Sequence, residues 1–140
     1  MLFTVISWGA TALMAVTCVA AIFRGGAPER WTAAALALAW LGSLLAPFDF
    51  SSPPWAVIGI DAGLFLVLLY WAAFSKKSWP IWAAAFQFLI LATHAAFARN
   101  IGLDQWGYVS AYYVWSIAVV VCLLIGVIRA RRIGRDAQVA

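Results

Sequence analysis

Three polar side chains lie within long apolar stretches of the chain, where burying them is costly. They are Asp61, Gln87 and His94, and His94 is the single histidine of the sequence. Gln87 and His94 are seven residues apart, so on a helix they fall on nearly the same face. A carboxylate and an imidazole in an apolar environment can hold a proton or orient a polar ligand. These three residues are therefore the first candidates for a site.

Hydroxyl groups in the first and last apolar stretches extend this set of candidates. The last stretch contains Tyr112, Tyr113 and Ser116, and the first contains Ser7 and Thr11. Small polar groups in a membrane helix usually face other helices, where they find hydrogen-bond partners that lipid does not offer. We predict that all five residues join Asp61, Gln87 and His94 in a ligand site or a polar network.

The inventory of residue types argues against several kinds of chemistry. One histidine does not supply the two axial ligands of a bis-histidine haem within one chain, and Cys18 and Cys122 have no metal-ligand spacing. No serine or cysteine stands beside a base at motif spacing, and no glycine-rich phosphate loop is present. We therefore predict no catalytic residue, no metal and no cofactor, and an intramembrane enzyme is the least supported interpretation.

Composition determines the class of protein that must position these residues. The chain has 140 residues, of which 66% are hydrophobic and 10% charged, and its mean hydropathy is +0.97. A soluble domain is about 45–50% apolar and about 25% charged, and a chain this apolar is accommodated by a bilayer. The net charge of +4 does not indicate nucleic acid, because four of the nine basic residues follow the last apolar stretch.

The apolar stretches predict an all-α, polytopic transmembrane helix bundle that forms one domain over residues 1–140. We expect five spans, with a loop from Arg24 to Arg30 and a basic tail that frays after the last span. The expected spans are residues 2–23, 31–47, 55–74, 79–98 and 107–128, and the tail is 129–140. The two short polar links and the glycine and proline residues between spans set these boundaries.

Charge placement predicts how the bundle is oriented. With the N-terminus outside and the C-terminus in the cytoplasm, Arg99 is the only basic residue on the outer side. In this orientation Asp61 lies about 9 Å below the outer end of its span, and His94 about 6 Å below the outer end of the next. Consecutive spans joined by a short loop are usually antiparallel neighbours. We therefore expect Asp61 and His94 to meet in the outer half of the bilayer.

One set of residues carries a resemblance to known proteins. The pattern consists of residues from three parts of the chain. It comprises Trp79, Pro80, Trp82, Ala84, Phe86, Gln87, Thr93 and His94, the segment Gly25–Arg30, and Tyr112, Trp115 and Ser116. This pattern resembles small uncharacterised inner-membrane proteins of alphaproteobacteria. The resemblance implies a multi-pass protein of the bacterial inner membrane, and it implies no site residue.

Two interpretations of the polar residues stay open. The first is a packing lock in a structural or accessory subunit of a larger membrane assembly, which would have a membrane-protein partner or form a homo-oligomer. The G-x-x-x-G pair Gly59 and Gly63 would then allow close helix packing. The second is a binding or conducting module, with a pocket in the outer half for a proton, a quinone-like ring or a lipid headgroup. In both cases the lipid bilayer is a partner and nucleic acid is not.

Overall fold

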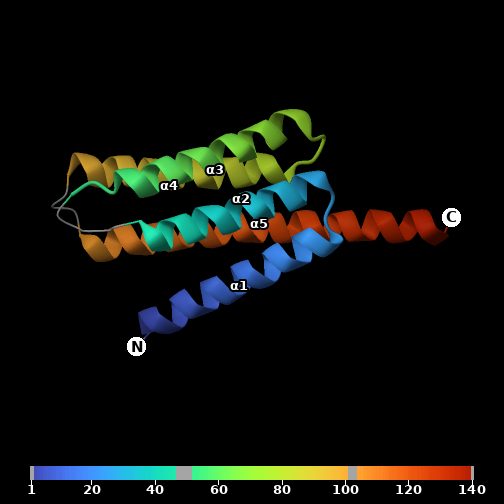
Figure 1. Ribbon diagram of the computed structural model, residues 1–140, viewed down its shortest axis with the longest axis horizontal. Helices are drawn as coiled ribbons and strands as arrows, with labels where there is room; N and C mark the ends of the chain where they lie inside the picture. The colour runs from blue at the N-terminus through green and yellow to red at the C-terminus, as the bar shows by residue number, and fades with distance from the viewer. Residues whose placement is uncertain (1, 47–51, 101–103, 140) are drawn as a thin grey trace.

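The computed structural model describes residues 2–46, 52–100 and 104–139, and the side chains within 7–46, 52–100 and 104–132. The described residues form five helices and no strand, which confirms the predicted all-α bundle. The helices are α1 (Leu2–Arg24), α2 (Ala27–Leu45), α3 (Trp55–Phe74), α4 (Trp79–Arg99) and α5 (Gln105–Val139). Figure 1 shows them extended along one long axis, with α5 continuing past the other helices at the C-terminus.

Helix packing places α4 at the centre of one half of the bundle, in contact with α3 and α5. Helix α1 contacts α2 and α5, and its N-terminal end diverges from the other helices (Figure 1). The side chains of Ala83, Leu68 and Leu123 are fully buried between α3, α4 and α5. Because alanine is small, Ala83 lets α4 approach its two neighbours closely. This half of the bundle provides a firm frame for polar side chains on α3, α4 and α5.

Helix α2 begins earlier than the predicted span 31–47, and the predicted loop Arg24–Arg30 is largely helical. Only Gly25 and Gly26 separate α1 from α2, which starts at Ala27. Pro28 is tolerated in the first turn of a helix, where its missing N–H needs no partner. The Glu29 carboxylate accepts the N–H of Gly26 at 3.0 Å. A proline and a charged residue that suggested a loop therefore form the start of a helix. The C-terminal boundary at Pro47 falls outside the described residues.

Helix α5 extends beyond the predicted span 107–128 at both ends. It begins at Gln105 because the Asp104 carboxylate accepts the N–H groups of Trp106 and Gly107, at 3.3 and 3.0 Å. Its backbone continues as helix to Val139, so the prediction of a frayed tail from residue 129 is wrong. Arginine and alanine favour helix, and the described backbone has no proline in this stretch that would stop it.

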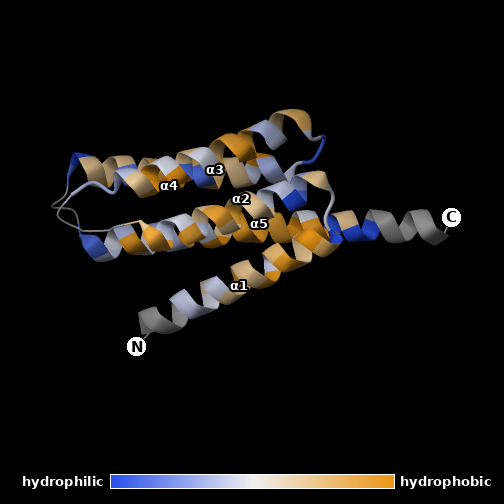
Figure 2. Ribbon diagram, in the orientation of Figure 1, coloured by the Kyte–Doolittle hydropathy of each residue, from blue (hydrophilic) through white to orange (hydrophobic). Residues whose placement is uncertain are grey.

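Four helices are long and apolar enough to cross a membrane. The stretches that meet this condition are Ser7–Arg24, Trp55–Phe74, Trp79–Arg99 and Gln105–Arg132. Hydrophobic residues predominate along much of these helices, and strongly hydrophilic residues are prominent at the ends of the bundle (Figure 2). Large exposed aromatic side chains occur near both ends, among them Trp8, Trp55 and Trp106 at one end and Phe23, Trp31 and Phe74 at the other. This distribution suits contact with a lipid bilayer, with the aromatic rings at its two interfaces.

The glycine pair on α3 does not take part in close packing within the bundle. Gly59 and Gly63 are exposed, and a Cβ atom placed on either would meet no atom within 4 Å. The close helix packing expected at this pair therefore does not occur between the described helices of this chain, and an approach by a helix of another chain stays a prediction. Their face of α3 points away from the other described helices, because Asp61, Leu64 and Leu68 on the opposite side are the buried residues of α3.

Candidate functional site

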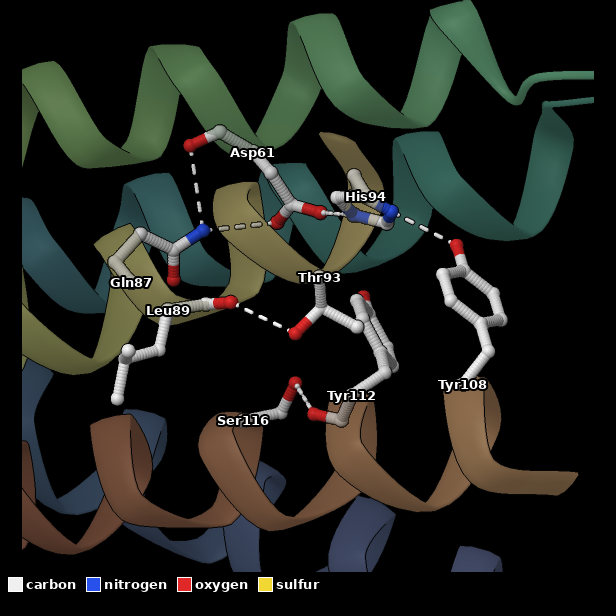
Figure 3. A network of polar contacts seen from close by, with 8 residues as sticks. All are labelled: Asp61, Gln87, Leu89, Thr93, His94, Tyr108, Tyr112 and Ser116. Atoms are coloured by element: carbon white, nitrogen blue, oxygen red, sulfur yellow. Dashed lines mark hydrogen bonds and ion pairs between the residues drawn. The ribbon is translucent and has the colours of Figure 1, made fainter. Parts of the chain in front are cut away.

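A chain of hydrogen bonds links α3, α4 and α5 through three polar residues that the sequence singled out and one further tyrosine (Figure 3). The Asp61 carboxylate contacts His94 through Oδ2 and Nε2 at 2.8 Å. Its other oxygen, Oδ1, accepts the side-chain amide of Gln87 at 2.9 Å. His94 Nδ1 lies 2.8 Å from the hydroxyl of Tyr108. We call these four residues the polar chain.

Helix geometry explains why the polar chain forms. Gln87 and His94 lie on one face of α4, as the seven-residue spacing predicts, and both reach Asp61 on the antiparallel α3. The Gln87 amide also donates to the backbone carbonyl of Asp61 at 3.2 Å, which ties it to the α3 backbone. Asp61, Gln87 and His94 are all at least 95% buried. The contact that the sequence predicted between Asp61 and His94 is therefore present.

Tyr108 was absent from the predicted set, although it completes the polar chain. The sequence placed it at the end of a span, where tyrosine commonly sits at the membrane interface. In the structure its exposed fraction is only 8%, and its ring stacks on Phe97 with centroids 4.4 Å apart. The sequence feature that could have identified Tyr108 is its hydroxyl group near the start of α5, close to the end of α4. The antiparallel packing of these two helices brings Tyr108 level with His94.

The imidazole of His94 can carry a proton between two oxygen atoms. With the Asp61 carboxylate ionised, Nε2–H donates a hydrogen bond to Oδ2, and Nδ1 then accepts a hydrogen bond from the Tyr108 hydroxyl group. With a second ring proton, both nitrogen atoms donate, and the Tyr108 oxygen becomes the acceptor. The polar chain therefore accommodates both protonation states of His94 without breaking a hydrogen bond. It connects the interior of the bundle with the end where α5 begins.

A pocket of about 250 Å³ adjoins the polar chain and is lined by residues of all five helices. We call it the central pocket. Asp61 and Gln87 line it from α3 and α4, and Tyr112 and Ser116 line it from α5. Trp40 and Ser43 line it from α2, and Thr11 and Met14 from α1. Apolar side chains such as Leu64, Ile90 and Val120 form the remainder of the wall.

The central pocket collects most of the predicted site residues. Six of the eight line it, namely Thr11, Asp61, Gln87, Tyr112, Tyr113 and Ser116. His94 is not among the lining residues, although it contacts Asp61 and its ring centroid is 5.6 Å from that of Tyr112. Ser7 lies one turn before Thr11 and is not part of the lining. Ser116 donates to the Tyr112 carbonyl at 2.7 Å within α5.

A second polar cluster, which the sequence did not single out, lies at the opposite end of the bundle. The Glu29 side chain is fully buried, and both of its oxygens contact Lys77 Nζ, at 2.7 and 2.8 Å. The Trp79 indole N–H donates to the same carboxylate at 2.8 Å, and the Gly26 N–H at 3.0 Å. We call this the Glu29 cluster. It joins the start of α2 to the link between α3 and α4.

Trp79 belongs to the Glu29 cluster and lies inside the bundle. A tryptophan at the end of a predicted span usually lies at the membrane surface, whereas the exposed fraction of Trp79 is 3% and it packs against α5 at Gly126. A Cβ atom at Gly126 would lie 2.6 Å from Trp79 Nε1, so only glycine fits there. Glu29 in the first turn after a glycine pair and a proline was the available signal, because helix starts commonly hold a carboxylate at this position.

The polar chain and the Glu29 cluster differ in how many hydrogen bonds the carboxylate already accepts. Glu29 accepts donors from three residues and is not among the residues that line the central pocket. Asp61 accepts two side-chain donors and faces the central pocket. A carboxylate can accept about four hydrogen bonds, so Asp61 retains capacity for a further partner on the pocket side.

No group of three histidine, cysteine, aspartate or glutamate side chains gathers as metal ligands would within the part of the chain that the structure describes. A scan against protein-family models, a search of the curated proteins and a search of the solved structures return no match. Function must therefore be argued from the geometry of the site.

Proposed function

We propose that this chain is a multi-pass membrane protein that binds a small molecule in the central pocket. The observation that carries the proposal is a cavity of about 250 Å³ that all five helices line and that contains a buried carboxylate. Binding sites for small molecules are mostly apolar concavities with a few convergent polar groups. Asp61, Gln87, Tyr112 and Ser116 are such groups, in a wall that is otherwise apolar.

Comparison with the Glu29 cluster favours a binding role over a packing lock around Asp61. A lock requires that every polar group be paired within the protein, because an unpaired buried group costs free energy. The Glu29 cluster meets this requirement with a saturated carboxylate and a close helix contact at Gly126. Asp61 instead lines the central pocket, which is not filled by protein atoms. This difference supports a binding role for the surroundings of Asp61 and a packing role for the Glu29 cluster.

The orientation and location of the protein form part of this proposal. We place the N-terminus outside and the C-terminus in the cytoplasm of a bacterium, in its inner membrane, with α2 as a fifth span. Helix α2 has 19 residues, about 28 Å at helical rise, and it packs against α1, α3 and α5. Lys76, Lys77 and Arg129 lie at the proposed cytoplasmic end and Arg99 at the other, which agrees with the positive-inside rule.

Filling the pocket tests the proposal. Ala10 lines the central pocket on α1, whereas Ala15 on the same helix is exposed and does not line it. Native mass spectrometry of protein purified gently from its own membranes should detect a bound small molecule in the wild type and in Ala15→Phe. Ala10→Phe should lose most of it, because the phenyl group occupies the cavity. Absence of a bound molecule from the wild type, or equal occupancy in the two variants, would contradict the proposal.

A role as an accessory subunit is a second candidate, favoured by the open glycine pair on α3. Gly59 and Gly63 leave a shallow strip that another membrane helix can approach closely. If a partner or a second copy packs there, Gly59→Leu should abolish co-purification or dimerisation in mild detergent. Ala92→Leu, at an exposed position of α4, is the matched control and should have no effect. Unchanged association in Gly59→Leu would exclude this surface.

A further inference from the structure

The lining of the central pocket has an unbalanced electrostatic character. Asp61 is the charged side chain among the described residues that line the pocket, and these residues include no lysine, arginine or histidine. Three aromatic side chains, Trp40, Tyr112 and Tyr113, line it as well. An anionic group placed there would lie close to the Asp61 carboxylate, without a basic side chain in the described lining to pair with it, in surroundings poor in water. The phosphate of a lipid headgroup therefore finds no suitable partner in this pocket.

We infer that the central pocket selects a small organic cation, an amine or a quaternary ammonium compound that carries an apolar group. This inference rests on the proposed binding function and specifies the ligand class. The carboxylate of Asp61 supplies the attraction for the charge, and the aromatic faces attract the same charge through cation–π contacts. Leu64, Ile90 and Val120 provide the apolar wall for the remainder of the molecule.

The polar chain holds Asp61 in position for this role. Gln87 is bonded to both the backbone and the side chain of Asp61, which fixes the rotamer of the acid. His94 contacts the other oxygen, Oδ2, and is not among the residues that line the pocket. The pocket side of the carboxylate stays available for an ammonium group. Gln87 and His94 are therefore positioning residues for the cation.

Two probes of the same shape test the inference directly. Benzyltrimethylammonium and neopentylbenzene differ in one atom, a charged nitrogen or a neutral carbon. Binding to the full-length protein in lipid nanodiscs is measured by calorimetry, with Ala10→Phe as the background for partitioning into lipid. We expect the wild type to bind the cation at least about tenfold more tightly than the neutral probe.

Asp61→Asn should abolish the preference for the cation and retain the affinity for neopentylbenzene. The matched control is Asp104→Asn, which removes an exposed acid outside the pocket and keeps a side chain that caps α5. Equal binding of the two probes to the wild type would overturn the cation inference while the pocket proposal stands. Binding of neither probe above the Ala10→Phe background would overturn both. The comparison of probes needs only the wild-type protein, so it stays decisive if Asp61→Asn does not fold.

Discussion

At the scale of residues, two buried carboxylates in this small protein have different surroundings. Glu29 is paired with Lys77, whose side chain is 37% exposed, and receives two further donors from Trp79 and Gly26. Asp61 is paired with His94, which is 99% buried, and faces a cavity. A buried charge that loses a partner is strongly destabilising, because its desolvation is no longer compensated. Stability should therefore depend most on the Glu29 cluster.

Removal of the Lys77 ammonium group should destabilise the protein. Lys77→Met leaves Glu29 as a buried carboxylate with only the Trp79 and Gly26 donors, and we expect a loss of about 3 kcal/mol in the free energy of unfolding. Lys76→Met removes the same charge from the exposed neighbouring residue and should change stability by less than about 0.5 kcal/mol. Reversible unfolding in mixed micelles measures both values. Equal effects of the two substitutions would show that the ion pair contributes little.

At the scale of elements, the contact between α4 and α5 depends on one glycine at the end of the bundle near the Glu29 cluster. The Trp79 ring, at the start of α4, occupies the position that a side chain at residue 126 would need. Gly9 on α1 is also within a helix, but a Cβ atom there would meet nothing within 4 Å. Both glycines are helical, but a side chain at residue 126 would clash with Trp79, whereas a side chain at residue 9 would meet open space.

Substitution of these two glycines separates helix propensity from packing. Gly126→Ala should force Trp79 away from Glu29 and lower the free energy of unfolding by about 1–3 kcal/mol, because the Trp79 ring already occupies the space beside residue 126. Gly9→Ala should be neutral or stabilise the protein by up to about 1 kcal/mol, since alanine favours helix. Thermal unfolding and the fluorescence of tryptophan report the two effects. A neutral Gly126→Ala would mean that Trp79 moves without cost.

At the scale of the whole molecule, the ends of the bundle are chemically distinct. The polar chain and the start of α5 lie toward one end, and the Glu29 cluster with Lys76 and Arg129 lies toward the other. Arg129 donates to the Ser78 hydroxyl at 3.1 Å, which connects α5 to the link before α4. Basic side chains near the membrane surface favour the cytoplasmic side during insertion.

Reporter fusions test the proposed orientation. Alkaline phosphatase fused after Ala140 should be inactive, and a fusion within the link between α4 and α5 should be active, because the enzyme folds only outside the cytoplasm. Green fluorescent protein fused at the same two positions should give the opposite pattern. An active phosphatase at the C-terminus would reverse the orientation. A loss of activity at both positions would mean that α5 does not cross the membrane.

The sequence alone determined the helical class and the contact between Asp61 and His94. In lipid, a long apolar stretch forms a helix because the helix pairs the backbone N–H and C=O groups within the segment. A seven-residue spacing places Gln87 and His94 on one face of such a helix. These inferences need only local periodicity and the antiparallel relation of consecutive spans. The end of α3 and the start of α4 also follow from sequence, since Ser75–Ser78 interrupts the apolar pattern.

Only the tertiary structure decided what surrounds each polar residue. Glu29 became a buried anchor because α2 packs its first turn against Lys77 and Trp79, which lie about fifty residues later in the chain. Tyr108 was drawn inward by its contacts with His94 and Phe97 on α4. The central pocket is lined by side chains of all five helices, which are far apart in the sequence. Residue types and spacings specify neither the angle between helices nor the volume left between them, because both depend on how all the side chains pack together.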